Sequence, residues 1–334
     1  SAWESHGGAI LLPGSRMAGL FYWLGLPETA RQIAGGVSFI LILTLWFWPG
    51  RKKLWRRLGA VLIFAAFFSV YYTKSPVEQD WVVFHERRAS ASFEGDIVTI
   101  VSGITHADDI DNVGPLGFDG IWLEGEHGSS DAVDMGNLTR ACDIWGMTSV
   151  ARLNANDQGL IYRTLDRGAQ GIVMPHVNTG SQAENVVAGG KFPPIGRRGY
   201  FPSRQSYGVS DFYEQANNET LLVVLIEDIE AWENLDEIIE VDHIDVFFVA
   251  PGDFAASMGH VQDMHHPDVQ AKIDDALSRI ISAGRTAGTL ATSESIERYS
   301  AMGVRFFYVE IQPWLEAGAR DLMARGEAGR QRGD

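Results

Sequence analysis

The 334-residue sequence contains very little cysteine, with Cys142 as its only thiol. One thiol cannot form a disulfide within the chain, so a disulfide-stabilised scaffold is excluded. Positive charge is also scarce, because 27 Lys and Arg stand against 43 Asp and Glu, a formal net charge of −16. Since binding to nucleic acid phosphates needs basic surfaces, we expect no nucleic acid partner.

The distribution of charge divides the chain into two unlike parts. Residues 1–90 carry 10 Lys and Arg and 5 Asp and Glu, whereas the remaining residues carry 17 and 38. The positive excess therefore belongs to the beginning of the chain alone, and the strongly acidic remainder is expected to fold separately.

The first part has two uncharged apolar runs, residues 33–48 and 58–73, each of 16 residues. A spanning helix needs roughly 17–25 residues, so these runs with their flanks predict transmembrane helices at about 30–49 and 57–74. Five positive charges between them predict a cytoplasmic loop in a bacterial inner membrane, with the later residues in the periplasm. Protection of the C-terminal part from protease in sealed spheroplasts would contradict this topology. A buried soluble hairpin is the alternative.

After residue 96 the pattern changes to short apolar runs that alternate with amphipathic ones. Eight such runs predict strands at residues 97–103, 120–125, 148–154, 171–177, 221–227, 245–252, 286–291 and 305–311. This alternation predicts a (β/α)8 barrel. We expect a membrane-associated region at 1–74, a linker at 75–92, the barrel at 93–326 and a tail at 327–334. An open doubly wound sheet is the alternative, but no glycine fingerprint follows the first strand.

Polar residues gather where these strands end. His127 follows the second strand, Arg152 ends the third, His176 ends the fourth, Glu227 ends the fifth and Asp253 follows the sixth. In a (β/α)8 barrel, the carboxyl ends of all strands meet at the active-site face. Two carboxylates suit Mg²⁺ or Mn²⁺, an arginine can bind a carboxylate or stabilise an enolate, and a histidine can move protons. A further pair, His265 and His266, is expected to lie in a surface loop.

Several segments, in this order, resemble those of the HpcH/HpaI aldolases, a family of metal-dependent class II pyruvate aldolases that includes 4-hydroxy-2-oxoheptanedioate aldolase. The segments are GFDGIWLEGEHG, ARLN, LDRGAQGIVMPHV, FPPIGRRGY, LIEDIEAWENLDEI and VAPGDFAASMGH. The resemblance covers roughly residues 93–326 and implies a TIM barrel.

The resemblance also implies an activity and a set of site residues. The activity is cleavage or formation of a C–C bond next to pyruvate, with a small 2-oxo acid as substrate and Mg²⁺ or Mn²⁺ as cofactor. The implied catalytic residues are His127, Arg152 and Asp166, with Asp166 paired to His127. Glu227 and Asp253 take the metal-ligand positions, and Gly252, Asp253 and Arg152 take the substrate-binding positions. The family also tends to form homo-oligomers.

Departures from the family pattern keep two hypotheses open. Glu124 stands where the family has aspartate, Leu225 replaces a glutamine, Phe254 replaces a leucine, and Glu310 and Trp314 add charge and bulk near the mouth of the barrel. The first hypothesis is an active pyruvate aldolase anchored in membrane lipid. The second is a barrel that has lost its metal and serves as a structural subunit of a larger membrane complex, such as a respiratory or photosynthetic assembly.

Overall fold

The computed structural model describes residues 97–131 and 133–331. The predicted membrane-associated region 1–74, with both predicted spans, and the predicted linker 75–92 lie outside the described residues. None of the described helices is both long enough and apolar enough to cross a membrane.

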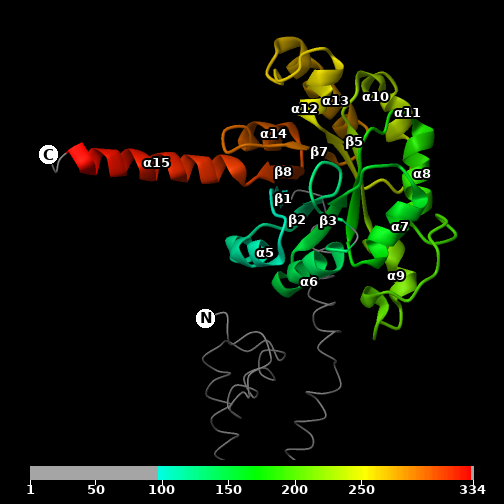
Figure 1. Cartoon of the computed structure of the whole chain (residues 1–334). Helices are drawn as coiled ribbons and strands as arrows, with labels where there is room; N and C mark the ends of the chain where they lie inside the picture. The colour runs from blue at the N-terminus through cyan, green and yellow to red at the C-terminus, as the bar shows by residue number, and fades with distance from the viewer. Residues whose placement is uncertain (1–96, 132, 332–334) are drawn as a thin grey trace, which may run out of the picture. The chain divides into compact units, whose positions relative to one another are not determined.

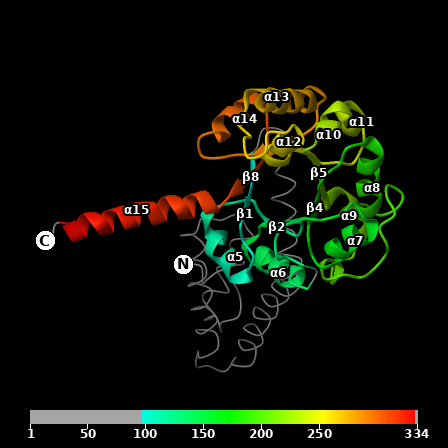
Figure 2. The same cartoon turned by 45° about the horizontal axis from the view of Figure 1, so that its top comes forward.

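Eight parallel strands close into a barrel in sequence order, with β8 paired to β1 (Figures 1 and 2). The predicted (β/α)8 barrel is therefore confirmed, and the alternative of an open sheet is wrong. Each strand lies within a predicted apolar run, because buried parallel strands are apolar on both faces. The strands are β1 (Val98–Ser102), β2 (Gly120–Glu124), β3 (Thr148–Arg152), β4 (Gly171–Met174), β5 (Leu221–Ile226), β6 (Val246–Val249), β7 (Ala287–Leu290) and β8 (Phe306–Glu310).

Helices connect the strands and cover the outside of the barrel (Figure 2). Two 3₁₀ turns accompany them, η2 (Gly114–Leu116) and η3 (Arg204–Ser206). The helices are α5 (Ala107–Val113), α6 (Met135–Trp145), α7 (Gln158–Asp166), α8 (Gly180–Gly190), α9 (Phe212–Glu219), α10 (Ile229–Glu233), α11 (Leu235–Ile239), α12 (Pro251–Ser257), α13 (Pro267–Ser282), α14 (Ile296–Met302) and α15 (Gln312–Gln331).

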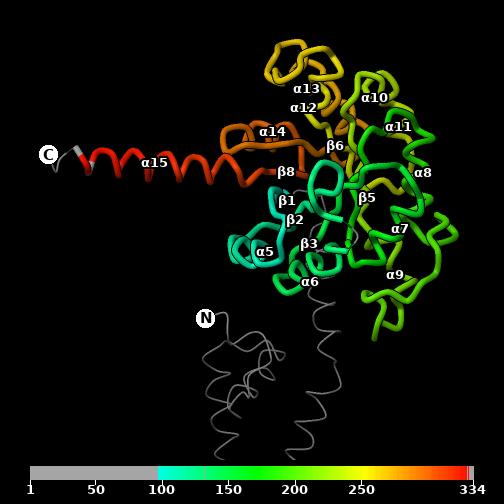
Figure 3. Tube along the Cα trace, viewed as in Figure 1, coloured from blue at the N-terminus to red at the C-terminus, as the bar shows by residue number. Residues whose placement is uncertain are grey.

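The last helix extends past the predicted end of the barrel. We expected the barrel to end at residue 326 with a tail beyond it, but α15 continues to Gln331, and Figure 3 shows it leaving β8 as one straight element. Trp314, expected near the mouth of the barrel, stacks on Phe118 with ring centroids 5.8 Å apart. The stacked rings cover apolar surface on each other.

Two apolar layers hold the barrel together. Residues that point outward from the strands, such as Leu123 and Ile226, pack with the helices in the larger cluster. Residues that point inward, such as Trp122, Leu225 and Phe248, fill the barrel itself. Side chains alternate between the two faces along a strand, so the next inward position lies two residues further on. On several strands, the inward position that follows the last apolar one lies at the carboxyl end of the strand. The polar groups described below occupy these positions.

Candidate active site

Arg152 lies between two carboxylates at the carboxyl end of the barrel. Glu124 and Arg152 are paired positions of the adjacent strands β2 and β3. The Nε of Arg152 donates to both oxygens of Glu124, at 3.0 and 2.8 Å, and Nη1 lies 3.1 Å from Oε2 of Glu126. Charge-assisted bonds of this kind fix both the position and the direction of a guanidinium group. The barrel therefore presents a preorganised cation at its rim.

Glu124 also organises the loop that follows β2. Its Oε1 accepts hydrogen bonds from the backbone N–H groups of Glu126 and His127, at 2.8 and 3.0 Å, and its Oε2 accepts one from Nε1 of Trp122 at 3.2 Å. Burial disfavours the charged form of Glu124, but the hydrogen bonds from Arg152 and from these amides outweigh burial and lower its pKa. Glu124 is thus ionised, and both of its carboxylate oxygens accept hydrogen bonds.

The pKa of Arg152 responds to the same neighbours. Burial alone would lower it, but the hydrogen bond and charge of Glu124, followed by the charges of Glu126 and Glu227, raise the pKa of the guanidinium group. Glu126 was not among the site residues predicted from the sequence. The signal was present in the segment EGEH, whose two carboxylates lie two positions apart, on either side of Gly125.

Glu227 is the most deeply buried acid of the site, with 1% of its side chain exposed. Its Oε1 accepts a hydrogen bond from the backbone N–H of His176 at 2.7 Å. Its Oε2 is buried and has no hydrogen-bond partner among the described residues. Burial raises the pKa of Glu227 to about 7; His176 opposes this rise, and the negative charges of Asp253 and Glu126 add to it. Glu227 therefore holds a proton more tightly than an exposed glutamate does.

His176 lies beside these acids and has an unusual backbone conformation. Its φ of 51° lies in the left-handed region, which is uncommon for a residue other than glycine and which clusters at functional sites. Its Nδ1 lies 2.9 Å from Oδ2 of Asp228, and its Nε2 lies 3.8 Å from Oε1 of Glu126. Burial lowers its pKa, but the bond with Asp228 and the charges of Glu227, Asp228 and Glu126 raise the pKa on balance.

The predicted metal ligands fit a divalent cation. The unpartnered Oε2 of Glu227 is a buried oxygen that a cation would satisfy. Asp253, in the first turn of α12, is exposed and lies close enough for its charge to raise the pKa of Glu227. Beside it, a Cβ built on Gly252 would meet no atom within 4 Å, so space for a ligand is open at the predicted substrate-binding position.

The predicted pair of His127 and Asp166 does not form within one chain. Asp166 is the last residue of α7, which runs from the end of β3 back toward the start of β4. It therefore lies toward the amino-terminal ends of the strands, where it accepts a hydrogen bond from Nη2 of Arg198 at 2.9 Å. His127 lies at the opposite end of the barrel, with 67% of its side chain exposed and its Nε2 3.8 Å from Oε2 of Glu126.

The structure locates two of the residues that depart from the family pattern. Leu225 is buried inside the barrel, one inward position before Glu227, so it adds apolar packing where glutamine would add a polar group. Glu310 is exposed at the end of β8, and its Oε1 accepts a hydrogen bond from the hydroxyl of Tyr308 at 3.3 Å. Neither side chain takes part in the contacts of Arg152 or Glu227 described above.

Known proteins are similar to this chain in sequence and in fold. Residues 101–306 match the HpcH/HpaI aldolase/citrate lyase family. The 2-keto-3-deoxy-L-rhamnonate aldolase of Klebsiella pneumoniae is 36% identical over 210 residues, which cover 61% of this chain and 79% of that protein. The hydroxypyruvate/pyruvate aldolase of Pseudomonas aeruginosa is 35% identical over 219 residues, which cover 64% and 82%.

A crystal structure of an HpcH/HpaI aldolase/citrate lyase family protein from Burkholderia cenocepacia shows the same fold, with a TM-score of 0.67 and 24% sequence identity over 72% of this chain and 98% of that one. The sequence relatives are aldolases, so the predicted enzyme class, an aldolase or lyase, is confirmed. Since the matched segment covers more than half of the sequence, this chain belongs to the HpcH/HpaI aldolase/citrate lyase family.

Proposed function

We propose that this aldolase cleaves or forms the C–C bond between pyruvate and an aldehyde, with a divalent metal as cofactor. One observation carries the proposal: at one end of the barrel, the unpartnered carboxylate oxygen of Glu227 lies on the same rim as an Arg152 held between two carboxylates. A 2-oxo acid needs both kinds of group, a cation for its oxo oxygen and a guanidinium for its carboxylate or enolate. The names of the two sequence relatives, which act on 2-oxo acids, support this substrate class.

The chain's own residues divide the work of cleavage. His127, exposed at the rim, accepts the proton of the 4-hydroxyl group through water, as the C3–C4 bond breaks and the aldehyde leaves. The electron pair of that bond passes to the enolate of pyruvate, whose developing charge Arg152 stabilises. Return of the proton to C3 then gives pyruvate, so the overall reaction gains and loses no proton.

Glu227 and Asp253 would hold the metal, which supplies Lewis-acid polarisation of the 2-oxo group when it is bound. Hard carboxylate oxygens suit Mg²⁺ or Mn²⁺. Asp166 can complete a pair with His127 only if a second copy of the chain brings it to the rim, which is compatible with the predicted homo-oligomer. The hypothesis of a metal-free structural subunit has no support from the sequence relatives, which are aldolases.

A cleavage assay tests the proposed function directly. We expect the purified full-length chain to release pyruvate from a 4-hydroxy-2-oxo acid when Mn²⁺ or Mg²⁺ is present, and to stop when a chelator removes the metal. Pyruvate is measured by a coupled enzyme, with several 2-oxo acids of different length. Absence of metal-dependent release from every one of these substrates would contradict the proposal.

We also propose that residues 30–49 and 57–74 anchor the enzyme in a bacterial inner membrane, with the barrel in the periplasm. The support is the sequence alone: two apolar runs with five positive charges between them. Protease added to sealed spheroplasts should then digest the barrel, as followed with an antibody against the C-terminal part. An intact barrel in spheroplasts that lose a known periplasmic-side marker would disprove this topology.

A further inference from the structure

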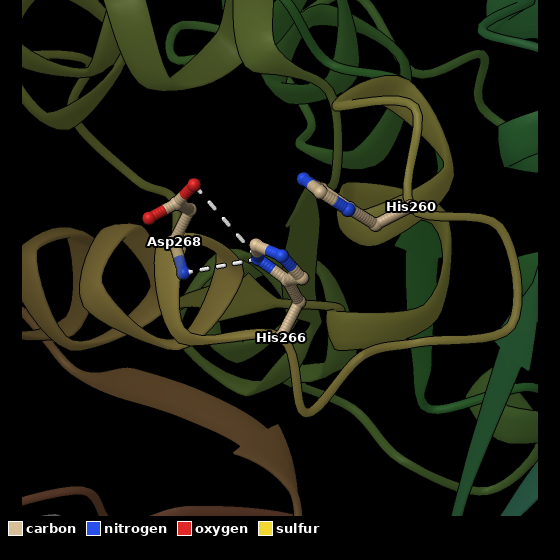
Figure 4. Close-up of side chains that lie close together, drawn as sticks. All are labelled: His260, His266 and Asp268. Atoms are coloured by element: carbon tan, nitrogen blue, oxygen red, sulfur yellow. Dashed lines mark hydrogen bonds and ion pairs between the residues drawn. The ribbon is translucent and has the colours of Figure 1, made fainter.

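A second group of potential metal ligands lies outside the active site, on the connection between α12 and α13. It consists of His260 in the connection, His266 at the N-cap of α13 and Asp268 in the first turn of that helix. One ligand atom from each residue lies within 4.8 Å of the other two, and no other His, Cys, Asp or Glu side chains within residues 97–131 and 133–331 form such a group. Figure 4 shows the three side chains together.

The two rings and the carboxylate are close neighbours. The rings of His260 and His266 stack with their centroids 3.7 Å apart and their planes at 21°. The Nδ1 of His266 accepts a hydrogen bond from the backbone N–H of Asp268 at 3.2 Å and lies 3.9 Å from Oδ2 of the same residue. In Figure 4 the carboxylate of Asp268 and the ring of His260 flank the ring of His266. Both rings are half-buried and the carboxylate is exposed, so an ion in solvent can reach all three.

Backbone hydrogen bonds hold the connection in this shape. The N–H of His260 donates to the carbonyl oxygen of Ala255 at 2.9 Å, and the carbonyl oxygen of His260 accepts from the N–H of Asp263 at 3.0 Å. The N–H of His266 then donates to the carbonyl oxygen of Asp263 at 3.1 Å. These bonds bring His260 back beside His266 without help from the side chains. The backbone therefore places the two rings side by side before any ion binds, and ligation would require the stacked rings to turn their nitrogens toward the ion.

The charge around the group favours a cation. No Lys or Arg occurs between Phe254 and Ala271, whereas Asp263 and Asp268 each add a negative charge. The next cation along the chain, Lys272, lies over the ring of Trp232, 3.2 Å from its centroid. The positive end of the α13 dipole would oppose a bound cation, and the two aspartates offset that opposition.

We propose that His260, His266 and Asp268 form a binding site for a transition metal ion of the Zn²⁺ class. Two imidazole nitrogens and one carboxylate oxygen suit a borderline-soft ion, and water can complete a tetrahedron. The site differs in kind from Glu227 and Asp253, which offer oxygen alone and suit harder ions. An ion bound here would tie the α12–α13 connection to the first turn of α13 and stabilise the fold. The proposal does not depend on the reaction that the barrel catalyses.

The test measures zinc bound by the full-length protein without a histidine tag, at pH 7.5 and with excess Mg²⁺ to occupy hard-ion sites. We expect one tightly bound zinc per chain, and about tenfold or greater weakening in His260→Ala, because two protein ligands hold zinc far less well than three. His260→Ala removes no helix cap, whereas His266→Ala would also remove the cap of α13. The matched control is His265→Ala, an exposed histidine of the same connection that is outside the group.

Thermal unfolding provides a second measurement. Zinc should raise the Tm of the parent chain and of His265→Ala, and should raise that of His260→Ala much less, because only an ion that binds the folded state stabilises it. Equal zinc affinity in the two alanine variants, or no retained zinc in the parent chain, would overturn the proposal. Aldol cleavage with Mg²⁺ is measured on the same samples, so a failure here is distinguishable from a failure of the proposed function.

Discussion

The substitution Glu227→Gln is expected to reduce metal-dependent aldol cleavage by about a thousandfold. Glu227 contributes the buried oxygen that has no hydrogen-bond partner in the described structure, and the amide of glutamine carries no charge to hold a divalent cation there. Lewis-acid stabilisation of a transition state supplies several kcal/mol, and about 4 kcal/mol corresponds to a factor of roughly a thousand in rate. The rate is measured as pyruvate release at the Mn²⁺ concentration that saturates the parent enzyme.

Measurements of folding and of metal binding distinguish this loss of activity from misfolding of the variant. Glutamine keeps the carbonyl oxygen that can accept the N–H of His176, so the Tm without metal should change little. Binding of Mn²⁺, followed by its paramagnetic signal, should weaken together with activity. The matched control is Glu230→Gln, an exposed glutamate in the neighbouring helix α10, which should retain full activity. A Glu227→Gln enzyme that still binds Mn²⁺ and turns over normally would rule out Glu227 as a ligand.

The substitution Arg152→Lys is expected to reduce kcat/KM by about a hundredfold to a thousandfold, the range found when one donor to a developing oxyanion is removed. Lysine keeps the positive charge between Glu124 and Glu126. It cannot, however, reproduce the planar fork that binds Glu124 through Nε and reaches Glu126 through Nη1. The charge would remain while its direction toward the substrate is lost. Steady-state kinetics with a 4-hydroxy-2-oxo acid measure this effect.

The retained charge is the reason to prefer lysine over alanine at this position. Removing it would leave two carboxylates without their shared cation, and the resulting instability would be confused with lost catalysis. The parallel control is Arg140→Lys, an exposed arginine of α6, whose substitution should change neither kcat nor KM. Normal kinetics in Arg152→Lys would mean that a point charge suffices, and that the orientation of the guanidinium has no catalytic role.

Glu124 departs from the family pattern, but its contacts still support Arg152. From the sequence alone, a glutamate in place of aspartate suggested drift away from activity. In the structure the longer side chain bonds Arg152, the indole of Trp122 and two amides of its own loop. It therefore still supports the arginine that the proposed reaction needs. Leu225, by contrast, places an apolar side chain inside the barrel, one inward position before Glu227.

The sequence by itself determined the barrel and the residues at its rim. Apolar runs alternating with amphipathic ones depend only on local periodicity, and the order of strand ends follows from the chain, so Arg152 and Glu227 were identified without coordinates. His127 and Asp253 were identified in the same way, and the family resemblance added Asp166 and Gly252. The resemblance did not indicate where a residue lies in the fold. In the structure, Asp166 accepts a hydrogen bond from Arg198 at the other end of the barrel.

Only the tertiary structure decided which side chains meet. His176 and Glu227 lie 51 positions apart, and they form a hydrogen bond because β4 and β5 are paired and His176 adopts a left-handed backbone. His260 stacks on His266 because the backbone of the α12–α13 connection folds back, whereas the sequence indicated only a surface loop. Such contacts depend on strand register and loop closure, and local sequence patterns carry no information about the distance between two loops.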